Sequence, residues 1–147
     1  MEKSRKNLRF ESIIIVLFAA LSLIQIIADL IWGDINSATV PAGAPANILM
    51  ITKIVILAVT VLLLLPKFYV GFKGMKVAKN PDKSKAHITW AKIVFVFAIL
   101  GFIDPTLAII NGGNLGDNLS TICSYIVEAI IYSEYIKFAK EVSKLAE

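Results

Sequence analysis

The chain has 147 residues, of which 57% are hydrophobic and 18% charged, and it carries a formal net charge of +4. The mean hydropathy of +0.75 excludes an ordinary soluble domain, whose apolar share is nearer half and is interrupted by charge. The length predicts a single domain. The one cysteine, Cys123, excludes an intrachain disulfide and argues against a thiol-ligated metal site.

The basic residues are grouped rather than spread along the chain. Thirteen of the fifteen lysines and arginines fall into three clusters, at 3–9, 67–85 and 137–144, and segments 33–47 and 111–118 contain neither residue. Basic segments that alternate with long apolar runs are typical of cytoplasmic loops, because lysine and arginine resist transfer across the bilayer. This pattern explains the positive charge better than nucleic-acid binding does.

In chain order, the apolar runs predict four transmembrane helices, at about 10–32, 48–66, 85–110 and 118–138. The first run is too long for the core of a signal peptide, so we expect it to remain as a membrane anchor. Polar segments at 33–46 and 111–114 form the outer turns. The expected fold is therefore all-α, a polytopic four-transmembrane-helix bundle in one domain, with both termini in the cytoplasm.

Several residues mark the expected helix ends. Asn47, Ser84 and either Asp117 or Asn118 are candidate caps for the second, third and fourth helices. Pro66 need not end the second helix, because residues 67–79 keep apolar side chains on one face and lysines on the other. We expect this extension to lie along the cytoplasmic surface of the membrane until an Asn-Pro pair at 80–81 stops it.

Within the predicted spans, where a charge costs roughly 3 kcal/mol on insertion scales, four ionisable residues lie away from the inner interface. Asp29 is expected roughly 5 Å below the outer interface, and Lys53 and Asp104 roughly 8 Å below it. Glu128 is expected near the midplane, at roughly 15 Å. Gln25 shares a helix face with Asp29, and Ser124 shares one with Glu128. Such polar faces should meet one another, because lipid offers them no partner.

These residues leave two interpretations open. In the first, Lys53 neutralises one acid, and the remaining acids suit a proton, a metal cation or an organic cation. In the second, Asp29 and Lys53 pair with each other or reach toward the interface and hold helices together. Glu128 is accordingly either a protonated functional group or an ionised structural partner of Lys53.

Residues 101–106 form a second candidate site. Pro105 has no N–H, so the carbonyl of Gly101 loses its helical donor close to the Asp104 carboxylate. This arrangement resembles the broken helices at which transporters hold cations. The alternative is an ordinary proline kink with a hydrated Asp104 near the outer surface.

The central basic segment has its own expected role and a recognisable pattern. Lys73, Lys76 and Lys79 are expected to contact anionic lipid headgroups at the cytoplasmic face. The run GFKGMK at 71–76, followed by NPDK at 80–83, resembles a group of small four-helix bacterial membrane proteins of uncharacterised function. The resemblance covers only this hairpin. It implies a multi-pass protein of the bacterial plasma (inner) membrane and no particular activity.

The sequence therefore predicts a membrane protein that binds or passes a cation or small cationic solute in an oligomer, because four helices offer little interior room. The alternative is a non-catalytic accessory subunit that packs against a larger membrane partner. No nucleophile–base pair or metal-ligand set is visible, so we expect neither enzymatic activity nor a cofactor. The candidate binding residues are Glu128, Asp104, Asp29, Lys53, Gln25, Ser124 and Gly101.

Overall fold

The computed structural model describes residues 2–32 and 46–146, and these residues are almost entirely helical. The elements are α1 (Glu2–Trp32), α3 (Ala46–Lys79), α4 (Ala86–Leu100), α5 (Ile103–Ile110), α6 (Leu115–Ser143) and the short 3₁₀ helix η1 (Lys144–Ala146). The all-α prediction is confirmed over this part of the chain. The outer loop predicted at 33–46 lies, apart from Ala46, outside the described residues.

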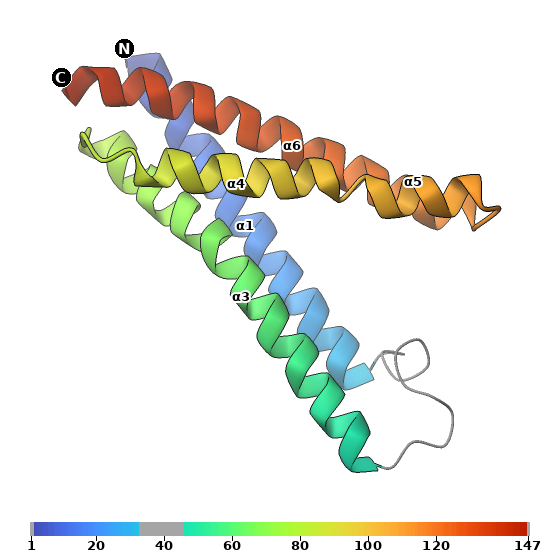
Figure 1. Ribbon diagram of the computed structural model, residues 1–147. Helices are drawn as coiled ribbons and strands as arrows, with labels where there is room; N and C mark the ends of the chain where they lie inside the picture. The colour runs from blue at the N-terminus through green and yellow to red at the C-terminus, as the bar shows by residue number, and fades with distance from the viewer. Residues whose placement is uncertain (1, 33–45, 147) are drawn as a thin grey trace.

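The helices form two hairpins that meet at one end of the molecule and separate toward the other (Figure 1). We call the α1–α3 hairpin arm 1, the α4–α5–α6 hairpin arm 2, and their shared end the basic end. The N-terminus, the α3–α4 connection and the C-terminus all lie at the basic end, so the three clusters of lysine and arginine are gathered there (Figure 1). Side chains of α1, α3, α4 and α6 form one core in this region, and the four-transmembrane-helix bundle expected from the sequence stays a prediction.

The hydrophobic core lies in the same region rather than midway along the apolar runs. Residues 67–79, which were expected to lie along the cytoplasmic membrane surface, contribute one face to this core, with Val70 and Val77 fully buried. The core draws on all four long helices: Leu8, Ile15, Val70, Val77, Ala78, Ile88, Ala91, Val94, Tyr132, Tyr135, Ala139 and Val142. The arms beyond it expose most of their large apolar side chains, as lipid-facing helices do.

Two glycines allow the helices to approach closely in this core. A Cβ atom at Gly71 would overlap Val16 of α1, and a Cβ atom at Gly74 would overlap Ser12 and the ring of Tyr135. Small residues at helix contacts permit such close backbone packing. The hydroxyl of Tyr135 donates to the carbonyl of Val70 at 3.0 Å, so α6 is tied to α3 where the glycines leave room.

The helix bounds differ in places from those expected. α3 continues through Pro66 to Lys79, as the amphipathic pattern predicts. The third predicted helix is divided instead into α4 and α5, with the interruption at residues 101–102. α6 begins at Leu115 because Asn114 caps it, accepting a hydrogen bond from the N–H of Gly116 at 3.0 Å. The caps predicted at Asp117 or Asn118 were therefore misplaced.

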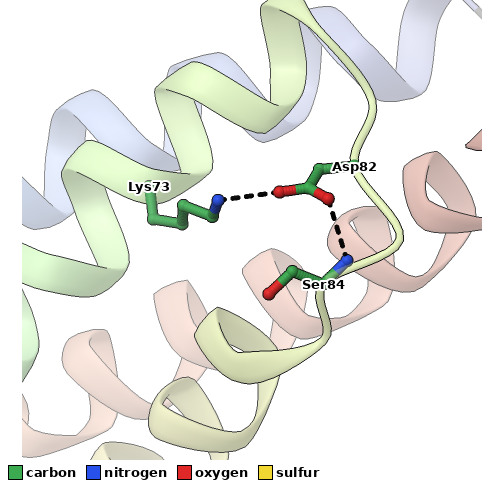
Figure 2. Close-up of polar contacts among 3 residues, drawn as sticks. All are labelled: Lys73, Asp82 and Ser84. Carbon is green, nitrogen blue, oxygen red and sulfur yellow. Dashed lines mark hydrogen bonds and ion pairs between the residues drawn. The ribbon is translucent and has the colours of Figure 1, made fainter.

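The connection between α3 and α4 is organised by a single carboxylate (Figure 2). Asp82 accepts a hydrogen bond from the ammonium of Lys73 at 2.8 Å and another from the backbone N–H of Ser84 at 3.1 Å. Ser84 thus serves as a donor to this turn, and no side-chain cap precedes α4. The Asn-Pro-Asp-Lys pattern therefore builds the turn that returns the chain to the core.

Three segments are long and apolar enough to cross a membrane, namely α1, α3 and the α4–α5 pair. This assignment rests on length and composition, and it indicates a membrane protein. Within the described residues α6 does not meet the same standard, because it carries Glu128, Glu134 and Lys137 along its length. It nevertheless packs beside α4 and α5 for much of its course (Figure 1).

Candidate functional site

The two arms separate at an ion pair between Lys67 of α3 and Glu128 of α6. The two side chains are about equally enclosed, with 25% of Lys67 and 22% of Glu128 exposed. The sequence offered Lys53 as the partner of Glu128, and that pairing is wrong. The ammonium of Lys53 instead lies 3.5 Å from the backbone carbonyl of Leu30, within arm 1.

A hollow of about 450 Å³ opens beside the ion pair, between α3, α4 and α6. Three aromatic residues contribute to its wall, Trp90 and Phe97 from α4 and Tyr125 from α6. The charged groups in the wall are those of Lys67 and Glu128. The complete lining is Leu62, Leu63, Pro66, Lys67, Trp90, Ile93, Val94, Phe97, Ala98, Tyr125 and Glu128. A mostly apolar hollow of this size, with few polar groups, is typical of small-molecule sites.

A second and much smaller hollow, of about 40 Å³, lies on the α1 side of the same ion pair. Phe18 and Ser22 of α1 line it together with Lys67 and Glu128. The hydroxyl of Ser22 is not directed to the carboxylate, because it donates to the carbonyl of Phe18 at 2.9 Å. The ion pair therefore separates two hollows and contacts both.

The polar residues predicted on the first two helices do not approach Glu128. Gln25 and Asp29 lie toward the far end of arm 1, and both are exposed. Neither side chain forms a hydrogen bond or ion pair with any other residue that the structure describes. Lys53 lies in the same arm, where its contact with the Leu30 carbonyl joins α3 to α1.

The second predicted patch lies on arm 2. Asp104 is exposed in the first turn of α5, where the helix dipole favours a negative charge. Gly101 packs against α6, since a Cβ atom there would overlap the ring of Tyr125. The hydroxyl of Ser124 donates to the carbonyl of Ser120 within its own helix at 3.0 Å. The expected convergence of acids from several helices is therefore absent among the described residues of a single chain.

The three lysines expected to contact lipid headgroups lie in different surroundings. Lys73 is engaged by Asp82, whereas Lys76 and Lys79 are exposed at the basic end. The hydrogen bond from Lys73, followed by that from the Ser84 N–H, lowers the pKa of the Asp82 carboxyl below its ordinary value of 3.8. Asp82 is therefore ionised in any ordinary buffer.

Sequence reasoning missed Lys67 and the aromatic wall. Lys67 was grouped with the loop lysines because it follows the last leucines of an apolar run. A signal was present, since Lys67 directly follows Pro66 at the start of the predicted amphipathic extension and is thus the lysine of this cluster nearest to the apolar run. Trp90 and Tyr125 fit the ordinary pattern of packing residues or interface anchors, so nothing in the sequence indicated that they line a hollow together with Phe97.

The described residues contain no group of three or more His, Cys, Asp or Glu side chains able to hold a metal ion. Comparisons with protein-family models, with curated proteins and with solved structures find no match to this chain. Function must therefore be argued from the geometry of the site itself.

Proposed function

We propose that this protein binds a lipophilic organic cation in the hollow beside Lys67 and Glu128. The observation that carries this proposal is a carboxylate placed among Trp90, Phe97 and Tyr125 in a space of about 450 Å³. Aromatic faces attract cations through their quadrupoles, and a carboxylate in an apolar wall supplies the opposite charge. A small inorganic cation would find too few oxygen ligands here.

In this proposal Lys67 acts as an internal counter-ion. Its ammonium neutralises Glu128 while the hollow is empty of cation, which avoids an unpaired charge in an apolar setting. An entering cation takes over the carboxylate, and the flexible lysine side chain moves toward the basic end. Binding is thus an exchange of one cation for another at Glu128.

We further propose that α6 crosses the membrane as a fourth span, with both termini in the cytoplasm of a bacterial cell. Its course beside α4 and α5, and the grouping of the lysine and arginine clusters at one end, support this topology. A single-cysteine test would use Cys123→Ser protein with Asn111→Cys before α6 or Lys140→Cys near its end. An impermeant thiol reagent should label the first variant in intact cells and spare the second, and the reverse labelling would invert the topology.

The binding proposal is tested with tetraphenylphosphonium and the purified protein in detergent. A Trp32→Phe background leaves Trp90 as the one tryptophan of a chain that has two, so its fluorescence reports on the hollow. Glu128→Gln should weaken binding about tenfold or more. Lys67→Met should strengthen binding about tenfold, because it removes the competing cation. These opposite effects of two charge changes are not expected for a merely structural pair.

Two controls accompany this experiment. Glu134→Gln removes an acid from the same helix but outside the hollow, and it should leave binding unchanged. The double variant Lys67→Met/Glu128→Gln removes both charges and should melt near the parent temperature without binding the cation. Retained affinity in Glu128→Gln protein, or weakened affinity in well-folded Lys67→Met protein, contradicts the proposal.

A second candidate function is that of a membrane accessory subunit or a unit of a homo-oligomer. It is favoured by three polar side chains, those of Gln25 and Asp29 on arm 1 and of Asp104 on arm 2. None of them forms a hydrogen bond or ion pair with another described residue. Polar groups within a bilayer require a partner, which a neighbouring transmembrane helix can provide. In a homo-oligomer, Asp29→Cys in a Cys123→Ser background should form intermolecular disulfides in oxidised membranes, and exclusively monomeric protein argues against contact between copies at this helix face.

A further inference from the structure

The basic end contains a hollow of about 1270 Å³ that belongs to neither side of the Lys67–Glu128 pair. It opens between the first two turns of α1 and the last turns of α3. Arg5, Lys6 and Arg9 line it from α1, and Lys76 and Lys79 line it from α3. Glu2 contributes the one acidic side chain in the wall. Five cations therefore face one acid around a shared space, and we call this the basic hollow.

Arg5 holds the two walls of the basic hollow together. Its guanidinium donates to the carbonyl of Ala78 at 2.9 Å and also to the carbonyl of Lys79. These carbonyls end α3 and carry the negative end of its dipole. Because Arg5 satisfies them, the ammonium groups of Lys76 and Lys79 are not needed at the helix end.

The remaining four cations, Lys6, Arg9, Lys76 and Lys79, have no carboxylate within ion-pair distance among the residues that the structure describes. Three lysines outside the hollow do have carboxylate partners, since Lys67 pairs with Glu128, Lys73 with Asp82 and Lys137 with Glu134. Like charges gathered around one hollow repel each other unless an anion neutralises them. The arrangement therefore calls for an anionic ligand from outside the chain.

Two exposed aromatic residues indicate the source of that anion. Phe10 follows Lys6 by one helical turn and is 61% exposed, and Phe72 precedes Lys76 by one turn and is 56% exposed. Residues four apart lie on the same helix face. Each cation thus has an apolar ring next to it on the side that leads into the apolar part of its helix. A lipid whose phosphate lies among the cations has acyl chains that can run along these rings.

We propose that the basic hollow binds the phosphate headgroup of an anionic membrane lipid. Arg9, Lys6, Lys76 and Lys79 contact the phosphate oxygens, and Arg5 positions the two helices that carry them. The basic hollow is more selective than a charged surface in general. Lys73 belongs to the same lysine cluster as Lys76 and Lys79, but it pairs with Asp82 and does not line the basic hollow. Basic pockets on the cytoplasmic side of membrane helices are suited to such headgroups.

The test measures lipid binding to the full chain in detergent by native mass spectrometry and by thermal shift. The probes are phosphatidylglycerol and phosphatidylcholine with the same acyl chains, and glycerophosphoglycerol as the headgroup without chains. Phosphatidylglycerol should bind and raise the melting temperature, while the other two probes should do neither at the same concentration. Arg9→Gln/Lys76→Gln should weaken phosphatidylglycerol binding about tenfold or more.

A control variant of equal charge separates a built site from diffuse attraction. Lys83→Gln/Lys92→Gln removes two exposed lysines that do not line the basic hollow, and it should retain most of the phosphatidylglycerol affinity. Equal weakening by the two double variants overturns the proposal in favour of general surface charge. Equal binding of phosphatidylcholine overturns the role of headgroup charge, and equal binding of glycerophosphoglycerol overturns the assignment to a lipid.

Discussion

His87 lies in the first turn of α4 with its imidazole fully enclosed by core side chains. Its ring meets that of Tyr135 edge-on, with 6.2 Å between the ring centroids. Neither ring nitrogen has a hydrogen-bond partner among the described residues. The fold thus encloses the imidazole of α4 against Tyr135 of α6.

An enclosed polar group without a partner costs about 1–3 kcal/mol. We therefore expect His87→Leu, which keeps a similar volume and removes both nitrogens, to raise the melting temperature of the detergent-solubilised protein. His87→Ala should lower it instead, because a cavity would remain in the core. A lower melting temperature for His87→Leu would show that the imidazole has a stabilising partner, such as an enclosed water molecule.

At the scale of the elements, the connection between α3 and α4 depends on one ionised side chain. Asp82 joins Lys73, in the last turns of α3, to the backbone just before α4 (Figure 2). These contacts lower the pKa of the Asp82 carboxyl below 3.8. A carboxyl with a lowered pKa in the folded state stabilises that state at higher pH, and this contribution disappears as pH falls through the lowered pKa.

This linkage predicts how stability changes with acid. Asp82→Asn should melt below the parent protein near neutral pH, by a small amount because the pair is exposed to solvent. The difference should remain down to about pH 4 and then shrink as Asp82 of the parent becomes protonated. Thermal melts of both proteins across pH provide the measurement. A difference that stays constant into strong acid would mean that hydrogen bonding, and not ionisation, accounts for the contribution of Asp82.

At the scale of the whole molecule, the arms are joined at the basic end and separate beyond it (Figure 1). The hydroxyl of Ser4 donates to Glu141 at 2.6 Å, so the start of α1 lies beside the end of α6. Among the described residues, no hydrogen bond or ion pair joins the far part of arm 1 to the far part of arm 2. At the far end of arm 2, α5 packs on α6 of the same arm.

Spin labels can measure this separation in a lipid bilayer. In a Cys123→Ser background, one pair would be placed at Lys3 and Lys140 near the basic end, and another at Asn47 and Asn111 near the arm tips. All four residues are exposed. We expect a clearly longer mean distance for the tip pair than for the basic-end pair, measured by pulsed electron paramagnetic resonance. Similar distances for both pairs would indicate arms that close into a bundle along their whole length.

Local properties of the chain were sufficient to predict the helices and the gathering of the basic clusters. The first three apolar runs are long and apolar enough to cross a membrane, and Pro66 does not interrupt the face pattern of α3. The third helix was predicted as continuous, although the loss of a donor for the Gly101 carbonyl, one turn before Pro105, marks the place where the structure divides it. These features depend on a residue and its near neighbours in the chain.

Contacts between distant helices were decided only by the tertiary structure. The selection of Lys67 rather than Lys53 as the partner of Glu128 depends on how α3 and α6 rotate and cross. The small residues Gly71 and Gly74 set that crossing by allowing α1 and α6 to approach α3. Hydrophobicity cannot rank such arrangements, because in lipid an apolar face is equally well accommodated by lipid or protein. Close packing and polar pairing make the choice, and both require the three-dimensional positions of side chains.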